Sequence, residues 1–255
     1  MLDAILSAAD VAAELAGSFL PVFKDKAEAQ PAARSLRSAL DSPDLGVIAE
    51  IKRRSPSAGA IDADLDPVRQ ALAYEAGGAD AISVLTEERH FGGSLDDLTA
   101  VRDAVELPVL RKDFTRNEAQ IWEARAAGAD AVLLIVGTLT QSRLEDLVAV
   151  ARDVRLDVIV ETHSAFEIER AIAAGADIIG VNNRDLSTFA TDLSVAEDLA
   201  PLLPTGVVSI GESGVSSVEG AARMRRAGYN AILVGEALVR SSDPAALVAA
   251  LKAAR

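Results

Sequence analysis

The chain has 255 residues, half of them hydrophobic, and a formal net charge of −14. Its length suits one large α/β domain or two ordinary ones, and no apolar run reaches the ~18–20 residues of a membrane helix. The absence of cysteine excludes disulfides, thiolate catalysis and cysteine-based zinc sites, and only two histidines argue against a multi-histidine metal site. The acidic charge argues against a nucleic-acid surface.

The N-terminal segment, residues 1–46, is predicted to be a helical extension ahead of the main domain. It carries Asp3 and Asp10 and lacks the basic region of a secretory signal, so we expect a cytoplasmic protein. Two helices are predicted, at about 2–16 and 24–41, joined around Pro21, and Pro31 would begin or kink the second. The extension is expected to cover either the bottom or the active-site mouth of the domain, and the sequence leaves both open.

A tetrapeptide beginning with Gly recurs about every 50 residues after residue 77. Each copy follows a helical pattern and precedes an apolar run, which predicts a helix ended by glycine, a short turn and a strand. A repeat of this length suits two strand–helix units. The copies occupy residues 78–81, 128–131, 175–178 and 228–231, and the eight predicted strands occupy 47–52, 81–86, 108–113, 131–136, 157–162, 178–183, 207–213 and 231–236.

Eight apolar strands that alternate with helices predict an α/β fold, the (β/α)₈ TIM barrel, over residues 47–255. With the extension at residues 1–46, we expect a single domain overall. The alternative is an open doubly wound sheet. It is disfavoured because the glycine-rich dinucleotide loop expected after the first strand is replaced by KRRSPSAG.

Polar residues stand where the predicted strands end, and the two-residue period of a strand points them inward. Glu50 and Lys52 end the first strand, where a buried carboxylate and ammonium are costly unless they face water or each other. Because carboxyl ends of barrel strands carry the active site, we expect these groups to line a wet cavity at one mouth. Isolated rim salt bridges are the structural alternative for any one of them. The remaining members of this set are Lys112, Glu161, Asn182, Arg184 and Glu212.

The loops after the last two strands contain Gly214 and Gly235, each expected immediately before a helix start. Free backbone N–H groups at such a position favour an anion, and phosphate sites of this fold recur there. The basic loop 52–55 would suit a second anionic group or the far side of the phosphate, although a solvated basic loop is the simpler interpretation.

Five motifs in order make the sequence resemble the indole-3-glycerol phosphate synthase family in its monofunctional form, across nearly the whole chain. They are VIAEIKRRSPSAG (47–59), SVLTEERHFGGSLDDL (83–98), PVLRKDF (108–114), GVNNRDL (180–186) and GESGV (211–215). The resemblance implies ring closure, decarboxylation and dehydration of 1-(2-carboxyphenylamino)-1-deoxyribulose 5-phosphate in tryptophan biosynthesis. It implies a phosphorylated small-molecule substrate and no metal or organic cofactor.

The resemblance also implies roles for individual residues. Lys112 would be the acid for ring closure with Glu161 paired to it, and Glu50 the base with Lys52 as second acid. Asn182 would contact a hydroxyl, and Glu212 and Ser213 would complete the rim. Ser55 and Arg184 would hold the anthranilate carboxylate, Phe91 and Phe114 would wall an aromatic slot, and Gly214, Gly235 and the backbone of Glu236 would hold the phosphate.

Glu236 departs from the family pattern, in which a small hydroxyl residue is common, so its side chain is expected to turn away from phosphate. Two other functions are kept as alternatives. A class I aldolase would use Lys112 as a Schiff-base nucleophile, and a non-catalytic sugar-phosphate-binding barrel would need only the glycines and cations. The sequence leaves the oligomeric state open and is compatible with a monomer; it also leaves open which anion each of Lys52 and Arg184 holds.

Overall fold

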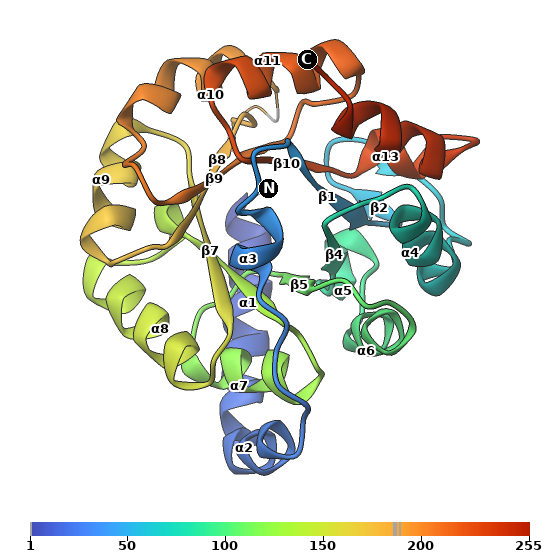
Figure 1. Cartoon of the computed structure of the whole chain (residues 1–255). Helices are drawn as coiled ribbons and strands as arrows, with labels where there is room; N and C mark the ends of the chain where they lie inside the picture. Colours follow the sequence, from blue (N-terminus) through green and yellow to red (C-terminus); the bar gives the residue numbers. More distant parts are fainter. Residues whose placement is uncertain (1, 186–187, 189) are drawn as a thin grey trace.

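In the computed structural model, which describes residues 2–185, 188 and 190–255, eight parallel strands close into a barrel (Figure 1). The first strand pairs with both the second and the last, which closes the ring, and each predicted strand is found within two residues of its expected bounds. The (β/α)₈ prediction is confirmed. Met1 of the extension and Leu186 of one family motif lie outside the described residues. The barrel strands are β1 (Gly46–Ile51), β4 (Ala81–Leu85), β5 (Val109–Lys112), β6 (Ala131–Ile135), β7 (Asp157–Thr162), β8 (Ile178–Asn182), β9 (Val208–Glu212) and β10 (Ala231–Val234).

An outer layer of helices surrounds the barrel. Most of these helices begin at a side-chain cap that satisfies otherwise unpaired N–H groups, such as Asn117, Ser164 and Ser217. The outer helices are α4 (Pro67–Ala76), α6 (Leu95–Ala104), α7 (Glu118–Ala126), α8 (Gln141–Asp153), α9 (Ala165–Ala173), α10 (Ser194–Leu199), α11 (Val218–Ala227) and α13 (Pro244–Lys252). Shorter elements are β2 (Arg54–Ser55), β3 (Gly59–Ala60), α5 (Glu88–Phe91), η1 (Val136–Thr138), η2 (Ala200–Leu202) and α12 (Glu236–Val239).

The four repeated tetrapeptides connect α4, α7, α9 and α11 to the strands that follow them, as predicted. All four repeat glycines have a positive φ, between 77° and 97°, a conformation that glycine adopts without strain. In three copies the third residue then accepts a hydrogen bond from a backbone N–H of the neighbouring strand. Asp80 accepts from Val47, Asp130 from Val109 and Asn230 from Ser209, at 2.8, 2.8 and 2.9 Å. The repeat therefore also fixes strand pairing at the amino end of the barrel.

The extension contains three helices, α1 (Leu2–Ser18), α2 (Leu20–Glu28) and α3 (Leu36–Leu40), so the prediction of two helices is wrong. Pro21 occupies the first turn of α2 rather than a linker, where its missing N–H costs nothing. The predicted helix 24–41 is interrupted around Pro31, and α3 starts afresh at its Ser35 cap.

The extension covers both ends of the barrel. Leu36 and Leu40 of α3 are fully buried in the cluster that fills the barrel interior, and Arg37 N donates to Asp157 at the start of β7. At the other end, Leu2 and Ile5 of α1 line the cavity at the mouth. Figure 1, a view along the barrel, shows α3 in front of the strands and α1 behind them. The extension therefore lies at both the bottom and the mouth of the barrel, the two positions that the sequence left open.

Within the described residues, no single helix is long and apolar enough to cross a membrane. Helices α1 and α2 meet the length and composition criteria only as a pair, and they are bent by 72° relative to one another.

Candidate active site

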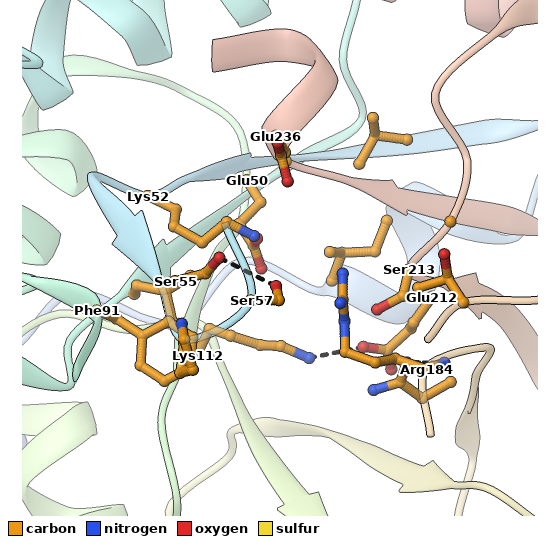
Figure 2. Close-up of a pocket in the computed structure, with 18 of the residues that line it drawn as sticks. Glu50, Lys52, Ser55, Ser57, Phe91, Lys112, Arg184, Glu212, Ser213 and Glu236 are labelled. Carbon is orange, nitrogen blue, oxygen red and sulfur yellow. Dashed lines mark hydrogen bonds and ion pairs between the residues drawn. The ribbon is translucent and has the colours of Figure 1, made fainter. Parts of the chain in front are cut away.

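A cavity of about 510 Å³ opens where the barrel strands end, and every strand contributes at least one residue to its lining. All the residues assigned to the site from the sequence line this cavity. In Figure 2, Glu50 and Lys52 extend from one side of the cavity, and Arg184, Glu212 and Ser213 from the opposite side. This is the end at which barrel enzymes carry their chemistry.

Lys112, at the end of β5, lies between two buried carboxylates. Its Nζ is 2.9 Å from Glu161 Oε2 and 2.6 Å from Glu212 Oε2. Asn182 Nδ2 donates to the other oxygen of Glu161 at 3.0 Å. Pairing with Glu161 agrees with the sequence-based expectation, whereas the shorter contact with Glu212 was not anticipated.

The surroundings of Glu161 and Glu212 shift the pKa values of these two carboxylates in opposite directions. Burial alone would lower the pKa of Lys112, but Glu161 and Glu212 outweigh it and raise that pKa above its ordinary value. Burial would likewise raise the pKa of Glu161, but Lys112 and His163 hold it below the usual range. Burial raises the pKa of Glu212; Lys112 opposes that shift and Glu161 adds to it. The cluster thus favours an ammonium, one firm carboxylate and one carboxyl group that protonates more readily.

Glu212 keeps one oxygen available inside the site. Among the described residues, its buried Oε1 has no hydrogen-bond partner. This oxygen lies against Gly180 of β8, where a Cβ would overlap it, so glycine at that inward position makes room for the carboxylate. A buried polar atom without a partner is costly and is typical of a functional site.

Glu50 and Lys52 line the cavity and also pair with each other, with 2.6 Å between Lys52 Nζ and Glu50 Oε1. The expectation that the two residues face a cavity is therefore correct but incomplete, since the two charges also compensate one another. Gly235 packs directly against Glu50, and a Cβ there would overlap the Glu50 carboxylate. Glycine at position 235 thus permits the Glu50 side chain as well as the turn into α12.

Part of the cavity lining is apolar. The rings of Phe91 and Phe114 lie 6.4 Å apart at an interplanar angle of 41°. The lining also includes Leu2 and Ile5 of α1, which the sequence did not reveal, and Leu85, Leu133 and Ile135 from strands without polar ends. Such a lining suits an aromatic ring.

The basic run after β1 contributes only one cation to the cavity lining, Lys52. Arg53 instead forms an ion pair with Asp97, and Arg54 donates to the carbonyls of Glu88 and Arg89 at 2.8 and 2.7 Å. The run therefore does not face the cavity as a whole, because Arg53 and Arg54 tie this loop to α6 and α5. The tie holds Ser55 at the cavity, where its hydroxyl contacts that of Ser57 at 3.3 Å (Figure 2).

The far end of the cavity is formed by the loops after β9 and β10. Gly235 immediately precedes α12 as predicted, but Gly214 does not precede a helix, because α11 begins only at Val218 behind its own Ser217 cap. Ser213 and Gly214 both have positive φ, 60° and 82°, and the strained Ser213 marks a tight turn at the site.

Glu236 turns its carboxylate toward Arg240, with 2.9 Å between Arg240 Nε and Glu236 Oε1. Both residues line the cavity, and Arg240 was missed in the sequence. Its position four residues after Glu236, one helical turn away, is the signal that could have revealed it.

Arg184 lines the cavity just beyond β8, where its backbone pairs with Thr191 in an isolated bridge. Its N–H donates to Asn182 Oδ1 at 3.0 Å, which fixes the orientation of the Asn182 amide toward Glu161. No cluster of three or more potential metal ligands is found among the described residues.

Comparison with known proteins gives one consistent result. The family model for indole-3-glycerol phosphate synthase matches residues 5–251. The chain is 49% identical over 261 residues to an indole-3-glycerol phosphate synthase of Kineococcus radiotolerans, covering 100% of this chain and 95% of that protein. Similar relatives are the synthases of Mycolicibacterium smegmatis (49% identity, 98% and 93% covered) and Paenarthrobacter aurescens (51%, 92% and 88%).

Solved structures add support for the fold alone. A thiamine phosphate pyrophosphorylase from Pyrococcus furiosus aligns with a TM-score of 0.62 at 17% identity, covering 85% of this chain and 96% of that one. The family match spans both the extension and the barrel, and it includes every residue of the cavity described above except Leu2. The chain therefore belongs to the indole-3-glycerol phosphate synthase family.

Proposed function

We propose that two lysine–carboxylate pairs in the cavity catalyse the synthesis of indole-3-glycerol phosphate. Lys112 with Glu161 serves ring closure, and Lys52 with Glu50 serves dehydration. The chain is a carboxy-lyase of tryptophan biosynthesis that acts on a phosphorylated small molecule. Its reaction closes the indole ring of 1-(2-carboxyphenylamino)-1-deoxyribulose 5-phosphate and releases CO₂ and water. The observation that carries the assignment of roles is Lys112, held as an ammonium between Glu161 and Glu212.

Lys112 is the acid for ring closure. The aromatic carbon attacks the ketone, and the ketone oxygen takes the Lys112 proton as charge develops on it. Glu161 keeps the ammonium in place and remains ionised. Loss of CO₂ from the same ring carbon then restores aromaticity.

Glu50 and Lys52 carry out the dehydration. Lys52 protonates the departing hydroxyl, and Glu50 removes the proton whose loss completes the indole. Their 2.6 Å contact supports this pairing, because the proton that Glu50 gains can return to Lys52 for the next turnover.

The substrate lies across the cavity with its ring in the apolar slot of Phe91 and Phe114. Ser55 and Arg184 hold the carboxylate, and Asn182 contacts a hydroxyl. The backbone N–H groups of Gly214, Gly235 and Glu236 hold the phosphate, while Glu212 and Ser213 complete the rim. The Glu236–Arg240 ion pair supports this orientation of the substrate. It neutralises the Glu236 carboxylate and places a cation at the proposed phosphate end of the cavity.

The extension (1–46) and the barrel (47–255) act as a single domain, because α1 and α3 supply residues to opposite ends of the barrel. We place the protein in the cytoplasm, where a charged phosphorylated substrate is retained, with neither nucleic acid nor a membrane as partner. A monomer suffices for this site, since one chain supplies all of the proposed roles.

Fluorescence of the indole product tests the function directly. The purified chain mixed with the anilino-deoxyribulose phosphate should release indole-3-glycerol phosphate, and Glu50→Gln should do so at least about 10²-fold more slowly. Full turnover by Glu50→Gln would overturn its role as base, and no turnover by the original chain would overturn the function.

The aldolase alternative is tested by borohydride. A lysine held as an ammonium by two carboxylates is a poor Schiff-base nucleophile. Reduction of enzyme and substrate together should leave the peptide that contains Lys112 unmodified, whereas a mass-shifted Lys112 peptide would favour the aldolase.

A further inference from the structure

His163, directly after β7, lies behind the catalytic cluster rather than in the cavity lining. Its Nε2 is 3.5 Å from Glu161 Oε1, and its Nδ1 is 3.3 Å from Glu167 Oε2. The imidazole therefore stands between a carboxylate of the proposed active site and a carboxylate of α9. No step described above uses it.

Glu167 is held in place by the start of α9. Ser164 caps this helix and accepts from Glu167 N, while Glu167 Oε2 accepts from the His163 backbone N–H at 2.6 Å. Gly137 leaves the space behind it, since a Cβ there would lie 2.9 Å from Glu167 Oε1. A carboxylate fixed in this way determines the imidazole tautomer, because the nitrogen that faces it carries the proton.

With Nδ1 protonated toward Glu167, the remaining nitrogen faces Glu161. His163 Nε2 is buried and has no hydrogen-bond partner among the described residues. Of the two Glu161 oxygens, Oε2 accepts from Lys112 and Oε1 from Asn182, and Oε1 is the one nearer His163. A neutral imidazole facing an ionised carboxylate would place two lone pairs together, so this geometry favours a proton on Nε2, in an ion pair with Glu161 at 3.5 Å.

The charged groups around the imidazole are mainly negative. The negative groups are Glu161 on β7, Glu167 on α9 and Glu212 on β9. The nearby cations, Lys112 on β5 and Arg170 on α9, act on Glu161 and Glu167. Burial alone would lower the pKa of His163, but Glu167 and Glu161 outweigh it and raise that pKa above its ordinary value. A protonated His163 is thus stabilised next to the acid–base cluster.

The reaction itself requires a proton from outside the substrate. An ionised carboxylate leaves as neutral CO₂ and a neutral water departs, so each turnover consumes one proton. Within the proposed roles, Glu50 returns its proton to Lys52, whereas the Lys112 proton leaves in the water. Lys112 must therefore be reprotonated once in every turnover.

We propose that His163 is a positioning residue and a proton reserve. It supplies, through Glu161, the proton that restores the Lys112 ammonium after each turnover. The N–H bond at His163 Nε2 breaks as an O–H bond forms at Glu161 Oε1. A half-turn of the carboxyl group then presents this proton to the neutral Lys112 amine, which regenerates the ammonium and the carboxylate. His163 then regains its proton from solvent: its side chain is 17% exposed but Nε2 itself is buried, so this step requires a transient opening of the cluster. This inference rests on the proposed roles of Lys112 and Glu161.

The dependence of kcat on pH tests whether His163 is this proton reserve. In the original chain, kcat should fall as pH rises through the titration of His163. His163→Gln should lower kcat by about tenfold or more, which is less than the roughly 10²–10⁴-fold effect of a group that touches substrate. KM should change less than about threefold, and the decline of kcat that depends on His163 should disappear. An unchanged kcat and pH profile in His163→Gln would overturn the proposal.

The second histidine of the chain offers a matched control. His90 pairs with Glu87 through Nδ1 at 2.9 Å, outside the cavity lining. His90→Gln should preserve the shape of the pH profile. It also leaves His163 as the single imidazole signal in NMR spectra, so its titration can be followed without any activity.

That titration should move to lower pH when Glu161→Gln or Glu167→Gln is added, because each change removes a negative charge that faces the imidazole. A His163 titration that is insensitive to both changes would overturn the proposed interaction of His163 with these carboxylates. Failure of the proposed role of Glu161 and failure of the proton reserve give different results. Full turnover by Glu161→Gln would refute the proposed role of Glu161, whereas an inactive Glu161→Gln beside an unaffected His163→Gln would refute the proton reserve alone.

Discussion

Lys112 Nζ is closer to Glu212 Oε2, at 2.6 Å, than to Glu161 Oε2, at 2.9 Å. The two carboxylates nevertheless differ in character. Glu161 has Lys112, Asn182 and His163 around it, whereas Glu212 leaves its second oxygen without a partner among the described residues. One ammonium therefore neutralises two buried acids unequally, and this inequality has consequences for stability.

Glu212→Gln should make the stability of the protein less sensitive to rising pH. Because folding raises the pKa of Glu212, its contribution to the free energy of unfolding is fully present below the ordinary glutamate pKa and is lost as pH rises through the folded-state pKa. Urea unfolding at about pH 5 and about pH 8.5 should show a smaller loss for the variant than for the original chain. Glu14→Gln, on the exposed face of α1, is the control, and parallel losses in the original chain and Glu212→Gln would contradict the prediction.

Arg184→Ala and Ser55→Ala should raise KM more than they lower kcat. The substrate carboxylate is present when substrate binds and leaves during the reaction, so contacts to it act mainly on binding. Steady-state kinetics of product formation give the two constants separately. Arg152→Ala, which removes an exposed arginine paired with Asp177, should change neither constant. A loss confined to kcat would show instead that these contacts form in the transition state.

Glu236→Gln should strengthen inhibition by inorganic phosphate. The change removes a negative charge from the proposed phosphate end and releases Arg240 from its ion pair. We expect the inhibition constant to fall about two- to fivefold, the size of an exposed charge interaction. Glu219→Gln breaks a comparable exposed pair with Arg226 on the outer helix α11 and should leave inhibition unchanged. Equal inhibition of Glu236→Gln and the original chain would place the phosphate elsewhere.

Deletion of residues 1–18 should leave a folded barrel with a raised KM. Helix α1 supplies Leu2 and Ile5 to the cavity and is tied to the barrel by Asp10–Arg116 and by Asn117 Nδ2 to the Ala13 carbonyl. Deletion of residues 1–41 also removes α3 and exposes the barrel interior, so it should abolish folding. Circular dichroism and substrate titration of both products measure these outcomes. An unchanged KM after the shorter deletion would contradict a role for α1 at the mouth.

Much of the fold could be predicted because the repeats encode it locally. A glycine after four of the helices and an apolar run that follows it are visible in the sequence, and both are found in the structure. The extension was harder, since proline is compatible with the first turn of a helix as well as with a linker, and Pro21 takes the first of these.

The site was predicted in position but not in all of its contacts. Strand periodicity places Lys112 and Glu161 at one mouth. The nearer contact to Glu212 depends on how β5 and β9 face one another across the barrel, which no local pattern specifies. Arg53 and Arg54 share the charge of Lys52 but point elsewhere because Asp97 and two carbonyls, distant in sequence, are available to them. Leu2 and Ile5 reach the cavity through the folding of the extension, which the apolar pattern of α1 alone does not show.

The proposed role of Lys112 as the acid for ring closure is tested by the kcat/KM of Lys112→Ala and Lys112→Arg. Lys112→Ala should lower kcat/KM by about 10²–10⁴-fold, because it removes the proton donor and the charge near the developing oxyanion. Lys112→Arg keeps the positive charge between Glu161 and Glu212, but guanidinium does not give up its proton, so activity should stay low. A Lys112→Arg enzyme with activity close to that of the original chain would contradict the account, because charge alone would then suffice.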